Sequence, residues 1–167
     1  MSNEALYSDE ARKKLTEIVD EVKLAMFATR LGSKPFGVVP MHSKRVDDDG
    51  DIWFLSPADS DHNADIEADS QVQLLYAGGS HTQVLSVYGQ AEIVTDREMI
   101  RQLYSGGDNA WFDGEDDPRV TAIRVTPKEA VYWDNDESSL VTMFKLARAA
   151  VTGRDQDIGT QGHMRMN

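Results

Sequence analysis

The sequence contains no cysteine among its 167 residues. This absence excludes disulfide bonds, thiolate metal ligands and a cysteine nucleophile. The first residues show no signal-peptide pattern, so together with the lack of cysteine we expect a reducing compartment such as the cytoplasm. No stretch approaches the roughly 18 apolar residues that cross a bilayer, so we expect no membrane-spanning segment.

Positive charge is also scarce. Seventeen basic residues stand against 29 acidic ones, which gives a net charge of −12. Such a field repels nucleic acid and anionic lipid, so we expect neither as a partner. A phosphate-bearing ligand would need a local site that is positively charged or rich in backbone N–H groups.

The common catalytic motifs are missing as well. The sequence has no phosphate-binding loop, no dinucleotide-binding glycine motif and no HExxH zinc motif. Its histidines, His42, His62, His81 and His163, lie too far apart to suggest a metal site. The acidic segment 47–51 lacks the spacing of a calcium loop and predicts a hairpin turn. No residue is assigned a catalytic role.

What the sequence does contain is a succession of short strands. The apolar stripe Leu15, Ile18, Val19 and Val22 predicts a leading helix over 8–23. Turn residues and alternating apolar residues predict six strands and three further helices. The strands are expected at 24–29, 36–46, 52–56, 72–77, 82–94 and 120–133, the last broken at Pro127, and the helices at 61–69, 96–104 and 140–151.

This pattern predicts a mainly β (α+β) fold: a six-stranded antiparallel sheet or barrel with peripheral helices. We expect a single domain over 1–153 and a loose polar tail over 154–167. Strand 36–46 is expected to form a hairpin with strand 52–56. Because proline cannot donate to a ladder, strand 36–46 should be an edge strand or bulged near Pro40.

Two segments suggest a ligand site. In the first, a strand leads through a hydroxyl-rich loop into the helix at 61–69, where free backbone N–H groups, Ser56, Ser60 and His62 favour an anion. On residue types alone, capping of the helix by Ser60 is the simpler explanation. The second is 38–42, where a strand containing proline exposes backbone donors and acceptors that a planar heterocycle can use.

Seven segments carry a resemblance to a known family. They are AMFATR (25–30), VVPMHS (38–43), DGDIWFLSPADSDHNADI (49–66), VQLLYA (72–77), VLSVYGQAEIVTD (84–96), AWFDGEDDPRVTAIRVTPKEAVYWD (110–134) and KLARAAVTG (145–153). In this order and spacing the chain resembles the FMN-binding split barrels related to pyridoxamine 5′-phosphate oxidase, and among them the general stress protein 26 group.

The resemblance implies a six-stranded split barrel that forms a homodimer, with FMN bound in clefts at the interface. It also implies a set of cofactor-binding residues, with Trp133 approaching the flavin from the other subunit. That set is Val39, Pro40, Met41, His42, Leu55, Ser56, Ser60, His62 and Trp133.

The sequence departs from the family pattern at two positions. Val39 stands where relatives often carry arginine, and His62 where they often carry lysine, so the phosphate site loses fixed positive charge. Lys44 and Arg45 are near in sequence and are the candidates to replace it. The acidic segment 134–137 follows Trp133 where the oxidases carry basic residues, which argues against pyridoxamine phosphate as the substrate.

We therefore expect an FMN-binding protein, an oxidoreductase acting in stress response whose flavin takes hydride from a nicotinamide or another small-molecule reductant. Two alternatives to an oxidoreductase stay open. One is a non-catalytic flavin carrier, and the other is a stress protein whose flavin site is degenerate and empty.

Overall fold

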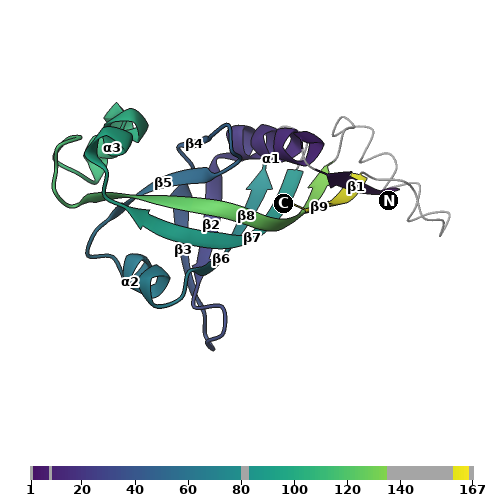
Figure 1. Cartoon of the computed structure of the whole chain (residues 1–167), viewed down its shortest axis with the longest axis horizontal. Coiled ribbons are helices and arrows are strands. Elements are labelled where there is room, and N and C mark those ends of the chain that lie inside the picture. Colours follow the sequence, from purple (N-terminus) through teal and green to yellow (C-terminus); the bar gives the residue numbers. More distant parts are fainter. Residues whose placement is uncertain (1, 8, 80–82, 135–159, 166–167) are drawn as a thin grey trace, which may run out of the picture.

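The computed structural model describes residues 2–7, 9–79, 83–134 and 160–165 (Figure 1). Strands make up most of it, and three α-helices lie around them. The elements in chain order are β1 (Ser2–Tyr7), α1 (Asp9–Val22), β2 (Leu24–Thr29), β3 (Gly37–His42), β4 (Arg45–Val46), β5 (Ile52–Pro57), α2 (Asp61–Ala68), β6 (Gln71–Gly78), β7 (Gln83–Val94), α3 (Arg97–Leu103), the 3-10 helix η1 (Gly106–Ala110), β8 (Val120–Asp134) and β9 (Thr160–Arg165).

The strands form one curled sheet in the order β1-β9-β8-β7-β6-β2-β3, and β5 joins it by pairing with the first half of β8. All the pairings are antiparallel except that of β1 with β9. Among the described strands, β3 pairs with β2 alone and forms no ladder with β5. We call this unpaired line between β3 and β5 the split.

The mainly β class is confirmed, but the sheet has nine strands where the sequence predicted six. The three additional strands are β1, β4 and β9. The expected loose tail therefore contains a strand at Thr160–Arg165. It forms because β5 covers β8 only over Val120–Val125, which leaves the backbone of Glu129–Asp134 for β9 to pair with. The helix expected over 140–151 lies outside the described residues.

The expected strand 36–46 is divided. Its first part, β3, pairs with β2, and only Arg45 and Val46 form the hairpin with β5. Pro40 lies in regular register opposite Met26, without a bulge. The predicted edge position of Pro40 is thus confirmed, and the expected hairpin with 52–56 is confirmed for Arg45 and Val46 but was wrong for β3.

The predicted break at Pro127 is a β-bulge inside a continuous β8. Pro127 pairs with Gly89, whereas Tyr88 pairs with Glu129, so Lys128 is the extra residue. A Cβ on Gly89 would lie 2.5 Å from the carbonyl oxygen of Thr126, so this close approach requires glycine. At the bulge the ladder is interrupted, so the missing N–H of Pro127 leaves no bond of the ladder unmade, and β7 and β8 stay paired on both sides.

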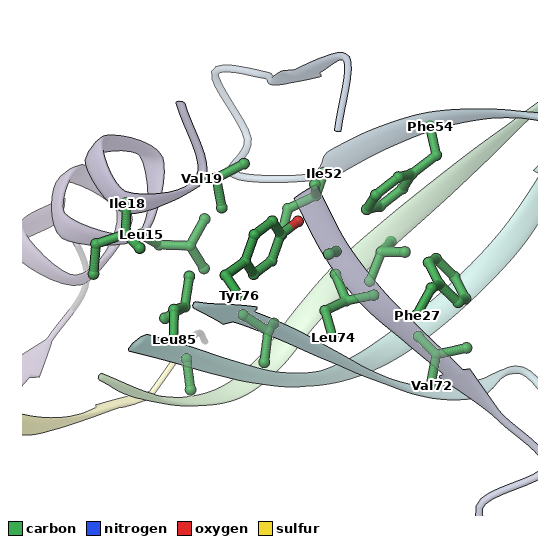
Figure 2. Close-up of a cluster of buried hydrophobic side chains, with 14 of the residues drawn as sticks. Leu15, Ile18, Val19, Phe27, Ile52, Phe54, Val72, Leu74, Tyr76 and Leu85 are labelled. Carbon is green, nitrogen blue, oxygen red and sulfur yellow. The ribbon is translucent and has the colours of Figure 1, made fainter. Parts of the chain in front are cut away.

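The core fills the inside of the curled sheet, beneath α1 (Figure 2). Three residues of the predicted helical stripe, Leu15, Ile18 and Val19, are buried there, and Val22 packs against them half-buried. Phe27 of β2 and Phe54 of β5 meet edge to face with their ring centroids 5.2 Å apart. This contact joins the two sides of the split from within.

Candidate functional site

The first turn of α2 lies where the sequence predicted an anion site. Ser60 is the N-cap, and its hydroxyl accepts a hydrogen bond from the backbone N–H of Asn63 at 3.3 Å. The predicted capping role is therefore confirmed. The amides of Asp61 and His62 precede the first intrahelical bond, so they point out of the helix end as free donors.

A buried polar network holds this turn from beneath. The Ser56 hydroxyl donates to Asn63 Oδ1 at 2.7 Å and lies 3.0 Å from the Thr121 hydroxyl, and Asn63 Nδ2 donates to Thr121 Oγ1 at 2.9 Å. All three residues are buried, Ser56 completely. The Ser56 hydroxyl thus ties α2 to β5 and β8 and does not face the solvent side of the turn.

His62 is half-buried on the same turn. Its Nε2 atom is buried and has no hydrogen-bond partner among the described residues. Burial lowers the pKa of His62 from 6.5, although the negative charges of Asp65 and Asp61 act in the opposite direction. Without a ligand, the neutral imidazole is therefore favoured at pH 7.

The side of α2 away from Asn63 contacts the β2–β3 hairpin. Asp65 Oδ2 accepts a hydrogen bond from the Thr29 hydroxyl at 2.7 Å and lies 3.2 Å from Nε of Arg30. Arg30 has a φ of 52°, a left-handed backbone that non-glycine residues seldom adopt. Sequence reasoning missed this ion pair, because 35 positions separate its two partners and neither belongs to a motif.

Lys44 and Arg45 do not supply the missing charge at α2. Lys44 Nζ donates to Asp108 at 2.7 Å and to Ser105 at 3.0 Å, and Arg45 Nη2 contacts Met99 Sδ at 3.2 Å. Both side chains are therefore directed toward α3 and η1.

The predicted residues of β3 alternate between two faces. Met41 is buried in the core and Val39 packs against it, whereas Pro40 and His42 are exposed. What these four residues share is the backbone edge of β3 that faces the split.

The remaining two predicted residues lie farther away. Leu55, on β5, is half-buried against the second apolar cluster, which surrounds α3. Trp133, on β8, is half-buried, and β8 is the fourth strand from β3 in the sheet order. One chain alone therefore does not bring Trp133 together with the other residues.

The outer face of the sheet beside β3 is apolar. Leu24, Met26, Val38 and Leu75 keep 43–46% of their surface exposed. Their strands are neighbours, and Met26 lies opposite both Pro40 of β3 and Leu75 of β6. We call these four residues the outer apolar face. An apolar patch formed by adjacent strands is typical of a surface that another protein covers.

The described part of the chain holds no group of three histidine or acidic side chains placed to bind a metal ion. Over the same residues, no helix has the length and apolar character needed to cross a membrane.

Comparison with known proteins identifies the class. The family described as pyridoxamine 5′-phosphate oxidase like matches residues 10–157, so the chain belongs to this family. It is similar to general stress protein 26 of Bacillus subtilis, with 25% identity over 138 residues, 79% of this chain and 94% of that protein.

A second relative is longer. Protein bli-3 of Neurospora crassa is 28% identical over 113 residues, which are 62% of this chain, and the chain spans about half (54%) of its length.

Solved structures show the same fold. A general stress protein 26 of Jannaschia sp. CCS1 superposes with a TM-score of 0.75 at 22% identity, covering 93% of this chain and 98% of that one. The general stress FMN/FAD binding protein of Xanthomonas citri gives a TM-score of 0.66 at 23% identity, with 78% and 93% covered. The fold is thus the split barrel.

Proposed function

We propose that this protein binds FMN along the split and acts as a flavin-dependent oxidoreductase. The observation that carries the proposal is the unpaired edge of β3, whose first residue, Gly37, lies beside Asp65 of α2, in a chain of this family. When bound, the flavin would supply reversible two-electron chemistry, and the protein would position it and control its surroundings.

Two features of the site fit a flavin phosphate. The Nε2 atom of His62 is buried without a partner among the described residues, and a phosphate oxygen would satisfy it. The amides of Asp61 and His62, with the Ser60 hydroxyl, add donors and the partial positive charge of a helix N-terminus. Ser56 contributes from beneath, by fixing Asn63 and hence the direction of this turn.

The ring end fits the other side of the split. The isoalloxazine edge carries donors and acceptors. The edge of β3 away from β2 offers matching backbone groups from alternate residues of Val39–His42, and no described strand pairs with that edge. Pro40 removes one donor from this edge, which discourages pairing with another strand. Leu55 belongs to β5, the strand on the opposite side of the split, and its side chain packs against the cluster around α3.

We further propose that a second copy of the chain covers the outer apolar face. Trp133 belongs to the same outward side of the sheet, because it pairs with Val84 two residues from the Ser86–Val131 pair, and Ser86 is opposite Leu75. A partner packed on this side would bring its own Trp133 toward the split, where one chain alone does not. We expect an interface above about 2,000 Å² in total, the obligate class.

The charge of the segment after Trp133 bears on the substrate class. The acidic segment 134–137 argues against pyridoxamine phosphate, and we propose that a nicotinamide or another small-molecule reductant delivers hydride to the flavin. A non-catalytic flavin carrier is the second candidate, since burial lowers the pKa of His62 and no residue is assigned a catalytic role.

The visible spectrum of the purified protein, with and without added FMN, tests the proposal. We expect the absorbance of oxidised flavin, bleaching on addition of NADH or NADPH under argon, and recovery in air. Bound flavin that no nicotinamide bleaches would support the carrier. A colourless protein that takes up no FMN would contradict flavin binding altogether.

A fluorescence titration with FMN at pH 6 and pH 8 tests the place of His62. Phosphate should favour the charged imidazole, so the affinity of the wild type should fall as the pH rises, beyond what ionisation of the phosphate itself explains. His62→Lys should flatten this dependence, and His62→Ala should weaken binding more at pH 6 than at pH 8. The same pH profile for all three proteins would remove His62 from the phosphate site.

Light scattering tests the second copy. The wild type should be a dimer at micromolar concentration, and Met26→Asp, in the centre of the outer apolar face, should be a folded monomer. Trp111→Asp is the matched control, since Trp111 is 77% exposed and belongs to the loop after η1. A monomeric wild type, or a Met26→Asp variant that stays dimeric, would contradict the proposal.

A further inference from the structure

We propose that Arg30 is the residue that supplies positive charge to the flavin phosphate, and that Asp65 orients it. This inference rests on the proposed flavin site and names a binding residue that the cofactor-binding set does not contain. Arg30 directly follows β2, whereas the predicted anion donors all belong to the segment 56–62.

The side chain of Arg30 contacts α2 from a left-handed backbone position. With φ at 52°, the chain turns at Arg30 in a way that an L-residue adopts only against a steric cost. The guanidinium nevertheless reaches α2, where Nε lies 3.2 Å from Asp65 Oδ2. The Thr29 hydroxyl donates to the same oxygen at 2.7 Å, which fixes the carboxylate on which the guanidinium rests.

Part of Arg30 is left for a ligand. Its side chain is half-exposed, and the structure gives its two Nη atoms no hydrogen-bond partner among the described residues. Arginine offers five donors in a fixed fork that matches phosphate oxygens. Asp65 contacts only Nε, so the outer pair of nitrogens remains free to bind an anion.

Gly37 leaves the room that this arrangement needs. It is the first residue of β3, and a Cβ built there would lie 2.7 Å from Thr29 Oγ1, 3.2 Å from Asp65 Oδ2 and 3.6 Å from Arg30 Nη2. Only a residue without a side chain lets the start of β3 approach the Thr29 hydroxyl and the Asp65 carboxylate so closely. The start of β3, the middle of α2 and Arg30 therefore meet at one end of the split.

The first turn of α2, where the phosphate is proposed to bind, and Arg30 lie on one side of this helix. His62 and Asp65 are three positions apart, so they are neighbours on the helix surface, and the charge of Asp65 acts on the titration of His62. Arg30, paired with Asp65, flanks the same turn. A dianion bound there would have Arg30 on one side and the helix amides on the other.

The other described cations nearby are committed elsewhere. Lys44 is bound to Asp108, and Arg45 contacts Met99. The Arg119 guanidinium donates to Asp117 at 2.7 Å, although its backbone carbonyl accepts from the loop before α2. Arg30 is thus the cation that the described structure pairs with α2 itself.

Binding of two flavins to three proteins tests the inference. FMN and riboflavin differ in the 5′-phosphate, so a residue that binds phosphate affects only FMN. For Arg30→Gln we expect FMN affinity to fall by about 10- to 100-fold, the range of a charge-assisted hydrogen bond, with riboflavin affinity unchanged. Arg30→Lys should recover part of the loss, because it keeps the charge but not the fork.

Lys23→Gln is the matched control. Lys23 lies at the other end of β2, also has a left-handed φ of 61°, and is exposed, so its substitution changes the net charge by the same amount. Its FMN affinity should equal that of the wild type. Thermal unfolding of each variant without flavin checks that the fold is intact.

Three results would overturn the inference. FMN affinity that Arg30→Gln leaves unchanged would remove Arg30 from the site, and equal losses for FMN and riboflavin would make its role structural. An equal effect of Lys23→Gln would reduce it to net charge. In each case flavin binding by the wild type, and so the proposed function, would stand. A wild type that binds neither flavin would overturn both.

Discussion

Removal of Asn63 offers a direct test of how the first turn of α2 is held. Asn63 is buried and is the only amide in the network with Ser56 and Thr121, to which it makes hydrogen bonds of 2.7 and 2.9 Å. The variant Asn63→Ala removes both bonds while keeping the backbone N–H that Ser60 caps. Its effect therefore reports on the network and not on the cap.

The magnitude follows from what the substitution leaves behind. Each lost bond contributes about 1 kcal/mol, and a buried hydroxyl left without a partner costs about 1–3 kcal/mol. Ser56 and Thr121 lie 3.0 Å apart and can bond each other, which limits the second cost. We expect Asn63→Ala to lower the free energy of unfolding by about 2–4 kcal/mol, a large share of the ~5–15 kcal/mol of a typical domain.

Urea unfolding followed by tryptophan fluorescence measures this change, because Trp53 is buried on β5, the strand that carries Ser56. The midpoint should fall by about 1–2 M at an unchanged slope. Ser56→Ala should cost less than Asn63→Ala, and the double variant should cost less than their sum by about 0.5–3 kcal/mol, since the two residues share a bond. Ser60→Ala, which removes only the cap, should cost about 1 kcal/mol.

Two outcomes would refute this reasoning. If Asn63→Ala changed the free energy of unfolding by less than about 0.5 kcal/mol, the network would not hold the turn. If the costs of Ser56→Ala and Asn63→Ala simply added, their side chains would not depend on each other.

Three further predictions concern other parts of the chain. Because burial lowers the pKa of His62, the folded state binds fewer protons than the unfolded chain below about pH 6.5, so stability should be lost as the pH falls through that range, and His62→Gln should remove this part of the loss in urea unfolding at pH 7.5 and 5.5. Gly89→Ala should destabilise the protein by about 1–3 kcal/mol, since its Cβ would meet a backbone oxygen, whereas Gly107→Ala, with open space around it, should leave the melting temperature unchanged. Hydrogen bonds from the Arg119 side chain and from two backbone amides hold the pKa of Asp117 well below its usual range, so Asp117→Asn should speed hydrogen exchange of those amides at pH 7.

Elements that depend on local pattern could be predicted from the sequence. The bounds of β2, Leu24–Thr29, follow from a short apolar run between a helix and turn residues. Ser60 and Asp96 mark the starts of α2 and α3, because a side-chain oxygen at the N-cap accepts from the backbone three residues later.

Elements that depend on distant partners could not be predicted. The strand Thr160–Arg165 has little apolar alternation, and it exists because half of β8 needs a partner. The pairing of β3 with β2, and not with 52–56, is likewise set by the whole sheet. At Pro127 the sequence indicates a break, but the compensation comes from Gly89 on another strand.

The candidate site divides in the same way. The segment 53–63 was predicted as a strand, loop and helix start, and the structure has β5 and α2 there. Its buried side chains bind Thr121 on β8, and Asp65, farther along the same helix, pairs with Arg30 just after β2. No local pattern in the sequence links these partners. Sequence reasoning therefore located the turn and missed what holds it.

These contacts place α2 across the split. On one side, Asn63 anchors the helix to β5 and β8, and on the other, Asp65 anchors it to the end of β2 and the start of β3. No backbone ladder joins β3 to β5 in the described sheet, so these two side-chain anchors set the distance between the edge of β3 and the helix amides. A rigid ligand with a ring at one end and a phosphate at the other needs that distance to be fixed before it binds, because ordering it on binding would cost affinity. Loosening either anchor should therefore lower the affinity for FMN more than the affinity for a ligand that reaches only the edge of β3. The selectivity of the proposed site thus depends on how firmly α2 is held.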